Sequence, residues 1–216
     1  MIKMFVYNHC PFCIKTRMVA DLAELEYELY ILANDDEQAH IEKIGSKQVP
    51  FLQKPNGDYI KESDVICNYI VKYQKFDIAS TKNNSQLNLL IKELHQISKT
   101  LTYPRIPHHQ QNIKDFPTQN AKDYFIKKKS AYIDNIEELY MNPAKDEIKK
   151  TQEKLNEINK HIQYPFINGD KFSWDDINIF PFLSIVTIIK DLVHIPKNIE
   201  AYLNSIESKT NIELYK

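Results

Sequence analysis

The chain has 216 residues, of which 43% are hydrophobic and 26% charged. This length and composition exclude a disordered protein and suit one or two globular domains, of which we expect two. The net charge of −1 excludes a general attraction to nucleic acid or to an anionic membrane surface. The best apolar run, residues 177–189, is interrupted by polar residues and is shorter than the roughly 18 residues of a membrane span. We therefore expect neither nucleic acid nor a membrane among the partners.

The cysteine usage bears on the cellular compartment. The chain has three cysteines, an odd number that forms no recognisable disulfide framework. Residues 1–4 run directly into a predicted strand instead of a long apolar signal segment. We therefore expect a reducing environment and a cytoplasmic location.

A strand, a turn and a helix are predicted around the first two cysteines. Residues 2–7 are rich in β-branched and aromatic side chains, and residues 14–25 carry apolar residues at helical spacing. Pro11 suits the first turn of this helix, which places Cys10 at the N-cap, where free N–H groups favour an anion. A cysteine so placed can have its pKa lowered to roughly 3.5–7.5, and its thiolate is a nucleophile. Cys13, one turn further, is expected to be less exposed and to resolve a disulfide formed by Cys10.

Other interpretations of the Cys-x-x-Cys pair are a zinc site and purely structural cysteines. A structural zinc site needs two further ligands, and the sequence shows neither a second Cys-x-x-Cys nor a spaced histidine pair. His108 and His109 are adjacent within a Gln-rich turn, and His9 has no evident geometry for sharing a metal with both cysteines. A Cys-x-x-Cys near a strand–helix–strand pattern is typical of a thioredoxin-like redox site. We therefore predict a redox dithiol and no metal.

The following residues complete an α/β domain that we predict to span residues 1–72. Helical and extended patterns alternate until a β-hairpin forms around an Asn-Gly turn, and a helix then ends the domain. Further strands are predicted at 27–32, 51–54 and 58–60, with a helix between the first and second of these and another after the third. This order is typical of a thioredoxin-like domain.

Polar and glycine residues predict where two of these helices begin and end. Asn34 with Glu37 approximates a capping box for a helix that ends near Gly45. Ser63 is the predicted N-cap of the last helix, in which Cys67 falls on the apolar face. We therefore interpret Cys67 as a small core residue, with a regulatory thiol as the alternative.

The pattern changes after residue 72. Polar residues dominate 73–84, which we predict to be a linker, and residues 85–216 carry apolar side chains at helical spacing, which predicts an all-helical domain. Helices are predicted at 87–101, 122–140 and 146–161 and again after residue 173, with a break at 103–117. Ser173 with Asp176 forms a capping box at the last helix, which we interpret as a folding element and not a site.

Several short motifs belong together. They are Tyr7 with His9-Cys10-Pro11-Phe12-Cys13, Gln48-Val49-Pro50, Glu62-Ser63, Asp175-Asp176-Ile177 and Phe180-Pro181. With them the chain resembles, essentially end to end, the larger bacterial glutaredoxins of the glutaredoxin 2 type, which are shaped like glutathione transferases. Those proteins usually carry Tyr where this chain has Phe12, so a phenol hydroxyl is missing. The resemblance implies an α/β thioredoxin-like N-terminal domain followed by an all-α glutathione-transferase-like C-terminal domain.

The resemblance also implies a glutathione site. In such folds the Val49–Pro50 peptide bond is cis, and the backbone of Val49 pairs with the extended tripeptide. Glu62 and Ser63 meet the γ-glutamyl end of the ligand at a helix N-terminus. Further expected glutathione contacts are Pro11, Phe12 and Pro50. Glutathione is thus implied as reductant and co-substrate, with no metal.

Together these observations predict a glutathione-dependent thiol–disulfide oxidoreductase that reduces glutathione–protein mixed disulfides and protein disulfides. Cys10 is the expected nucleophile and Cys13 the expected resolving thiol. The partners are glutathione and glutathionylated or disulfide-containing proteins, and we expect a monomer. One alternative is an omega-class-like thiol transferase or dehydroascorbate reductase that uses Cys10 alone.

A second alternative is a non-catalytic protein, either a glutathione-binding module or a relative of the chloride intracellular channels, which keep a related Cys-Pro-Phe motif. The intact second cysteine and the lack of a continuous apolar span argue against the channel-like version. A third alternative is an iron–sulfur scaffold in which two chains share a cluster through Cys10 and glutathione.

Overall fold

The computed structural model describes residues 1–80 and 85–216, and these form two compact units. The first unit contains Met1–Asp77 and Pro107–Lys127, and the second contains Ile78–Ile106 and Lys128–Lys216. Residues 81–84, the last part of the predicted linker, lie outside the described residues. The division of the sequence into 1–72, a linker at 73–84 and 85–216 stays a prediction.

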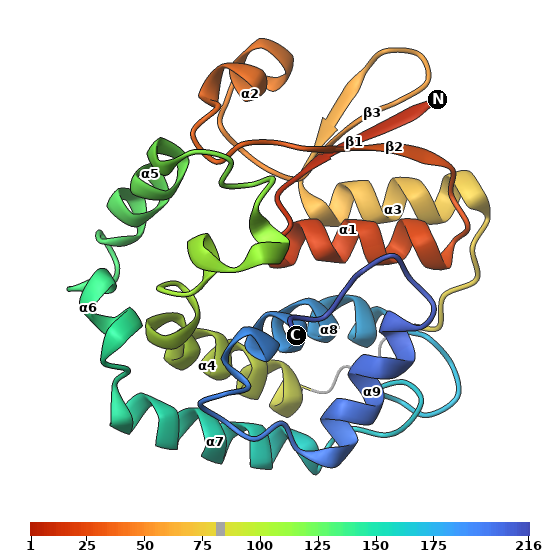
Figure 1. The fold of residues 1–216 in the computed structure, drawn as a ribbon. Helices are drawn as coiled ribbons and strands as arrows, with labels where there is room; N and C mark the ends of the chain where they lie inside the picture. The colour runs from red at the N-terminus through yellow and green to blue at the C-terminus, as the bar shows by residue number, and fades with distance from the viewer. Residues whose placement is uncertain (81–84) are drawn as a thin grey trace. The chain divides into compact units, whose positions relative to one another are not determined.

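The first unit is built on a four-stranded mixed sheet with the strand order β2-β1-β3-β4. Strand β1 is parallel to β2 and antiparallel to β3, which is antiparallel to β4. Helices α1 and α3 lie side by side on one face of the sheet, and α2 lies on the other (Figure 1). The elements are β1 (Ile2–Val6), α1 (Pro11–Leu22), β2 (Tyr27–Ile31), α2 (Glu37–Ile44), β3 (Phe51–Gln53), β4 (Tyr59–Lys61) and α3 (Ser63–Gln74). This is the predicted order of strands and helices.

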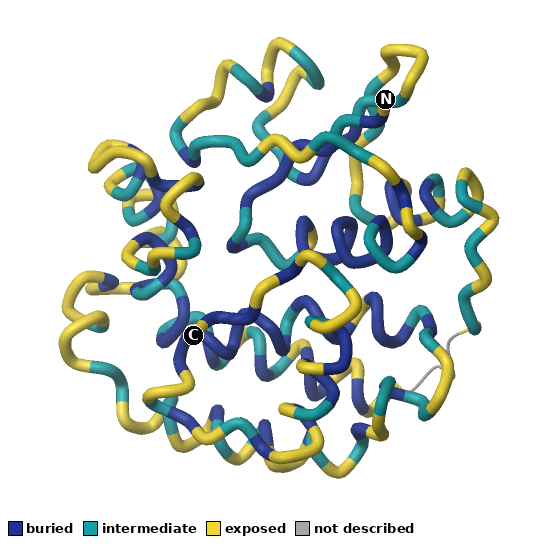
Figure 2. Tube along the Cα trace, turned by 45° about the vertical axis from the view of Figure 1, so that its right-hand side comes forward, coloured by how far each residue is buried: buried dark blue, intermediate teal, exposed yellow. Residues whose placement is uncertain are grey.

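The core of the first unit lies around the central strands β1 and β3. Met4, Val6 and Leu52 on these strands have no exposed surface, and neither do Met18 and Val19 of α1. Figure 2 shows these buried stretches in dark blue. Because helices cover both faces of the sheet, the C-terminal end of β1, from which the Cys-x-x-Cys turn leaves, is held on a packed base.

Residues 107–127 join the first unit although they come much later in the chain. The segment contains most of the 3₁₀ turn η1 (Ile106–His108), all of the 3₁₀ turn η2 (Gln110–Asn112) and most of helix α5 (Gln119–Lys129). The backbone N–H of Asn34 donates to the Asp115 carbonyl oxygen at 2.8 Å. The Asn120 amide donates to Asp35, and the Lys47 ammonium lies 3.7 Å from the centre of the Tyr124 ring. The segment is therefore fastened to the region around α2.

The second unit is helical. Helix α4 (Ser85–Thr102) packs against α7 (Lys145–Asn159) and α8 (Trp174–Val186), and α9 (Lys197–Glu207) packs against α7 and α8. A short helix α6 (Ile136–Met141) and a 3₁₀ turn η3 (Thr187–Ile189) complete it. Helix α8 is apolar on most sides and almost wholly buried. No helix among the described residues is both long and apolar enough to cross a membrane.

Three local predictions were wrong. The helix predicted over 122–140 is two helices, α5 and α6, separated by a segment whose last residue, Asn135, has a left-handed backbone (φ 51°). Helix α2 is capped by Asp36, whose carboxylate accepts from the N–H of Ala39, and not by Asn34. The N-cap of α3 is Glu62, and Ser63 is the first helical residue. The α2 end at Gly45, in a left-handed conformation, is as predicted.

Candidate active site

The Cys-x-x-Cys turn has the geometry that its sequence predicts. Cys10 is the N-cap of α1, with extended backbone angles (φ −88°, ψ 119°), and Pro11 is in the first helical position. The backbone N–H of Cys13 donates to the Cys10 carbonyl at 2.9 Å. Cys10 is half-buried, whereas the side chain of Cys13 is fully buried, and its sulfur accepts from the Tyr7 N–H at 3.4 Å. Cys10 is thus the more accessible of the two residues.

The two thiols have opposite electrostatic environments. A hydrogen bond from the Cys13 thiol lowers the pKa of Cys10 to about 7, in spite of partial burial, and the charge of His9 and the N–H groups of Cys13 and Phe12 act in the same direction. The Cys10 sulfur makes no capping hydrogen bond of normal geometry, so these N–H groups act on it mainly as nearby dipoles. Burial, together with the neighbouring Cys10 sulfur, raises the pKa of Cys13 well above its ordinary value. The lowered pKa favours Cys10 as the sulfur that forms the thiolate, and the raised pKa favours the neutral thiol at Cys13.

A buried carboxylate lies directly behind the turn. Asp115 has no exposed surface, and its two oxygens accept from the N–H of Asn8 (3.0 Å), the N–H of His9 (3.1 Å) and the Nδ1 of His9 (2.6 Å). The imidazole of His9 is stacked on Tyr7 and Phe116. The residue before Cys10 is therefore fixed in both its backbone and its side chain.

A second polar network joins the turn to the loop before β3. The hydroxyl of Tyr7 lies 3.0 Å from Nε2 of the buried His40, whose Nδ1 lies 3.0 Å from the carbonyl oxygen of Gln48. Because a carbonyl only accepts, Nδ1 carries the proton, so Nε2 of the neutral ring accepts from Tyr7. Burial lowers the pKa of His40 and raises that of Tyr7, which favours this neutral arrangement.

The other predicted site residues lie on this loop and at the start of α3. The Val49–Pro50 peptide bond is cis, as the resemblance implied. The Gln48 side chain donates to the Glu62 carboxylate at 2.6 Å. Glu62 is exposed and Ser63 half-buried. Sequence reasoning missed Asp115 and His40 because each acts through a contact distant in sequence, and neither belongs to a local motif.

Phe12 and Cys67 differ sharply in accessibility. Phe12, in the turn, is 51% exposed, so its ring is available to a ligand or a partner. Cys67 lies in the core with no exposed surface, and burial raises the pKa of its thiol to about 12, so it is a core residue and no nucleophile. Within the described residues no group of three or more His, Cys, Asp or Glu side chains could hold a metal.

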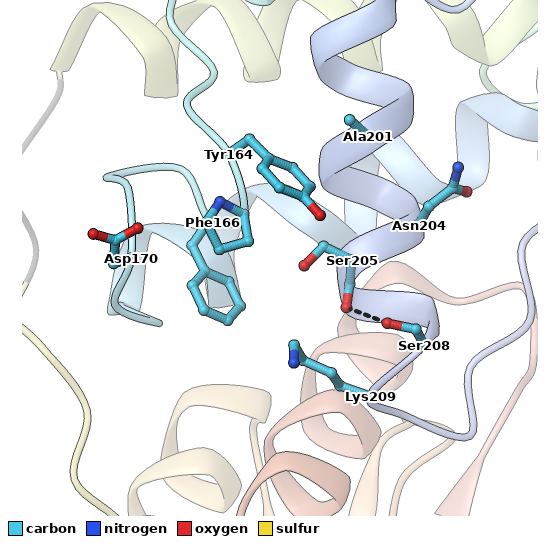
Figure 3. A pocket seen from close by; sticks show the side chains of 9 residues that line it. Tyr164, Phe166, Asp170, Ala201, Asn204, Ser205, Ser208 and Lys209 are labelled. Carbon is cyan, nitrogen blue, oxygen red and sulfur yellow. Dashed lines mark hydrogen bonds between the residues drawn. The ribbon is translucent and has the colours of Figure 1, made fainter.

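The helical unit has a hollow of its own, of about 610 Å³. Figure 3 shows the side chains around it, which come from the loop before α8 and from α9 and the residues just after it. They include Tyr164, Phe166, Asn204, Ser205 and Lys209. None of the lining residues is a cysteine or a predicted site residue, so the hollow is separate from the thiol chemistry.

Two family models match the chain in consecutive regions. The model described as "Glutathione S-transferase, N-terminal domain" matches residues 9–72. The model described as "Glutaredoxin 2, C terminal domain" matches residues 86–216, which is more than half of the chain.

Similar proteins include several that match end to end. Glutaredoxin 2 of Escherichia coli K12 is 30% identical over 213 residues, covering 99% of this chain and 97% of that protein. The crystal structure of glutaredoxin 2 from Salmonella typhimurium in complex with glutathione has a TM-score of 0.91 at 31% identity, covering 100% of this chain and 97% of that one. A glutathione S-transferase of Ceriporiopsis subvermispora in complex with glutathione, at 16% identity, shares the fold, with a TM-score of 0.74 over 96% of this chain and 97% of that one.

Proposed function

The chain belongs to the glutaredoxin 2 family, and on that premise we propose that it is a glutathione-dependent thiol–disulfide oxidoreductase. The observation that carries the proposal is the asymmetry of the two cysteines. Cys10 is accessible, caps a helix and has a pKa lowered to about 7, whereas Cys13 is buried and has a raised pKa. A nucleophile and a resolving thiol need these two properties, respectively.

The monothiol reaction uses Cys10 alone. Its thiolate attacks the glutathione sulfur of a glutathione–protein mixed disulfide, so that a Cys10–glutathione bond forms and the protein leaves as a thiolate. The thiolate of a free glutathione then attacks the glutathione sulfur of the intermediate. Oxidised glutathione departs and Cys10 is again a thiolate, so that one free glutathione is consumed for each mixed disulfide reduced, and the other half of the oxidised glutathione comes from that mixed disulfide.

The dithiol reaction adds Cys13. When Cys10 attacks a protein disulfide, it becomes part of a mixed disulfide and loses its negative charge. That charge and the hydrogen bond to Cys10 are two of the causes that raise the pKa of Cys13, so forming the mixed disulfide makes Cys13 easier to deprotonate. Cys13 then attacks Cys10, the second protein thiolate leaves, and two glutathione molecules reduce the resulting Cys10–Cys13 disulfide.

Glutathione recognition is proposed on the loop and helix start beside the turn. The relative from Salmonella typhimurium was solved in complex with glutathione. In this chain the backbone of Val49 would pair with the tripeptide as a short strand. The N-terminus of α3 at Ser63 would attract the carboxylate of the γ-glutamyl end, and the exposed Glu62 its ammonium. Pro11, Phe12 and Pro50 would supply the apolar contacts.

The proposal is tested by glutathione-coupled turnover of a glutathionylated peptide. We compare the unmodified protein with Cys10→Ser, Cys13→Ser and, as a matched control in the core, Cys67→Ser. The first variant is expected to lose activity by on the order of 10⁴-fold or more, since a hydroxyl replaces the thiolate. Cys13→Ser should retain turnover of the glutathionylated peptide and lose reduction of protein disulfides. Absence of turnover by the unmodified protein would contradict the proposal and favour a glutathione-binding module.

A further inference from the structure

Asp115 occupies an unusual place for a carboxylate. It has no exposed surface, and it comes from the segment 107–127, which returns to the first unit from later in the chain. Burying an isolated carboxylate is costly unless its oxygens accept hydrogen bonds. All three described donors to these oxygens belong to Asn8 and His9, the two residues before Cys10. The carboxylate is thus directed at the active-site turn alone.

The contact with His9 fixes more than the backbone. An ionised carboxylate only accepts hydrogen bonds, so Nδ1 of His9, 2.6 Å from Oδ2, carries a proton toward Asp115. The ring is stacked on Tyr7 and Phe116 and meets the edge of Phe125. Two of these contacts come from the same late segment as the carboxylate. The imidazole therefore has one orientation beside Cys10, with its Nδ1–H directed at Asp115.

We propose that Asp115 is the positioning residue of the thiol site: through His9 it sets the nucleophilicity of Cys10. This inference deepens the proposed function, on which it rests for its biological meaning. Asp115 touches neither the thiols nor a substrate, and it acts by holding the imidazole where its charge favours the Cys10 thiolate. The lowering of the Cys10 pKa by the charge of His9 supports this assignment.

Several charged and titratable groups lie near Asp115 and Cys10, and their effects on Cys10 must be distinguished from that of His9. Tyr7 at the end of β1 and Cys13 in α1 both feel the negative charge of Asp115. Arg17 of α1 donates to the side chain of Asn8 at 3.1 Å. The remaining neighbours of Tyr7 are His40 of α2 and Tyr124 of α5. His9 is hydrogen-bonded to Asp115 and also acts on the pKa of Cys10.

The direction of the effect distinguishes two roles for Asp115. If its charge acted directly on the thiols, neutralising it would remove a negative charge and lower the pKa of Cys10. If it acts through His9, neutralising it releases the ring from the position in which the charge of His9 lowers the pKa of Cys10, and that pKa rises. A purely structural anchor would change the stability of the protein and leave the pKa where it was.

The test measures the pH dependence of Cys10 alkylation by iodoacetamide on the reduced full chain, with the modified peptide identified by mass. Asp115→Asn keeps the shape of the side chain and removes its charge. We expect Asp115→Asn to raise the midpoint of the alkylation profile by about one pH unit. This is the size of shift expected when a thiolate loses the influence of one nearby positive charge, here that of His9. His9→Phe, which keeps the stacking, should raise the midpoint similarly, and Asp115→Asn should add nothing in the His9→Phe background.

Asp58→Asn is the matched control. Asp58 lies in the turn between β3 and β4, at the far end of the sheet, because β3 runs antiparallel to β1. Asp58→Asn removes one negative charge, as Asp115→Asn does, and should leave the midpoint of the Cys10 alkylation profile unchanged. An unchanged or lowered midpoint in folded Asp115→Asn, or an equal shift in the His9→Phe background, would overturn the inference.

Two further outcomes are also decisive. If Asp115→Asn does not fold, as judged by circular dichroism, His9→Phe alone decides, because an unchanged midpoint in that variant removes the link to Cys10. Alkylation needs neither glutathione nor a disulfide substrate. A protein without glutathione-coupled turnover but with the expected shift would therefore contradict the proposed function and leave the role of Asp115 intact.

Discussion

Helices α1 and α8 both begin at an N-cap residue with an extended backbone, but the two N-cap side chains make different contacts. Helix α1 begins at Cys10, a half-buried residue whose sulfur makes no capping hydrogen bond of normal geometry. Helix α8 begins at Ser173, whose N–H and hydroxyl both donate to the Asp176 carboxylate, at 2.8 and 2.7 Å. The other oxygen of Asp176 accepts from the N–H of Ile167 at 2.8 Å. The start of α8 is thus closed by a carboxylate of its own first turn, whereas the start of α1 carries a reactive thiol.

The difference separates a reactive site from a folding element. At α8 a buried carboxylate accepts from the N-cap residue Ser173 and from Ile167, and so ties the preceding loop to the start of the helix. At α1 the corresponding position holds a thiol, and the positive end of the helix stabilises its thiolate. The same physical property of a helix N-terminus thus contributes stability in one unit and reactivity in the other.

The largest expected effect comes from breaking the satisfied helix start. Asp176→Ala leaves the Ser173 and Ile167 donors without their acceptor, and we expect it to lower the free energy of unfolding by about 3 kcal/mol. Asp146→Ala, in the exposed first turn of α7, is the control and should cost less than about 1 kcal/mol. Denaturant unfolding followed by circular dichroism measures both. Equal losses of unfolding free energy in the two variants would show that the buried start of α8 contributes no more stability than the exposed start of α7.

The next largest effect is expected at His40, which joins Tyr7, just before the Cys-x-x-Cys turn, to Gln48 in the loop before β3. His40→Phe removes the donor to the Gln48 carbonyl and the acceptor for the Tyr7 hydroxyl. We expect KM for a glutathionylated peptide to rise about 5- to 30-fold with little change in kcat, which corresponds to about 1–2 kcal/mol for the lost hydrogen bonds. Steady-state kinetics with His161→Phe as the control checks this. A fall in kcat at constant KM would show that the network serves the chemical step instead of binding.

A smaller effect is expected in the pH dependence of Cys10. Because its folded-state pKa is lowered to about 7, its thiolate forms as the pH rises through 7, whereas an ordinary thiol titrates near about 8.5. At pH 7 the thiolate fraction is about 15-fold higher, but a less basic thiolate is about fivefold less nucleophilic, so alkylation should be about threefold faster than that of a free cysteine. The alkylation midpoint is the measurement, and a midpoint near 8.5 would mean that this helix start does not favour the anion.

The smallest effect is expected at Phe12, where the resemblance described above leads us to expect a tyrosine. Phe12 is 51% exposed, so the hydroxyl of a tyrosine there can point to water without loss of a buried contact. Phe12→Tyr should therefore change glutathione-coupled turnover by less than about twofold. A larger gain would show that the hydroxyl contacts the substrate.

The parts of the site that depend on local sequence were predictable. Cys10 as N-cap and Pro11 in the first helical position follow from the backbone preferences of proline and from the free N–H groups of a helix start, and both are confirmed. Ser63 was wrong as an N-cap because Glu62 takes that position with a left-handed backbone (φ 67°), which sequence propensity does not predict for glutamate.

The parts that depend on long-range contacts were not predictable. Asp115 lies 106 residues after His9 in a stretch that, from sequence, only interrupts a helical pattern. No periodicity or motif marks it, because its role arises when the chain returns to the first unit. The break between α5 and α6 was missed for a related reason, since the apolar spacing continues through it.

The most direct test of the central claim is to trap the intermediate. Cys13→Ser is incubated with a glutathionylated peptide without free glutathione, and peptide mapping by mass spectrometry locates any glutathionyl group. We expect one glutathionyl group, on Cys10 and not on Cys67, and none in Cys10→Ser. A glutathionyl group on Cys67, or none on Cys10 in the folded variant, would contradict it.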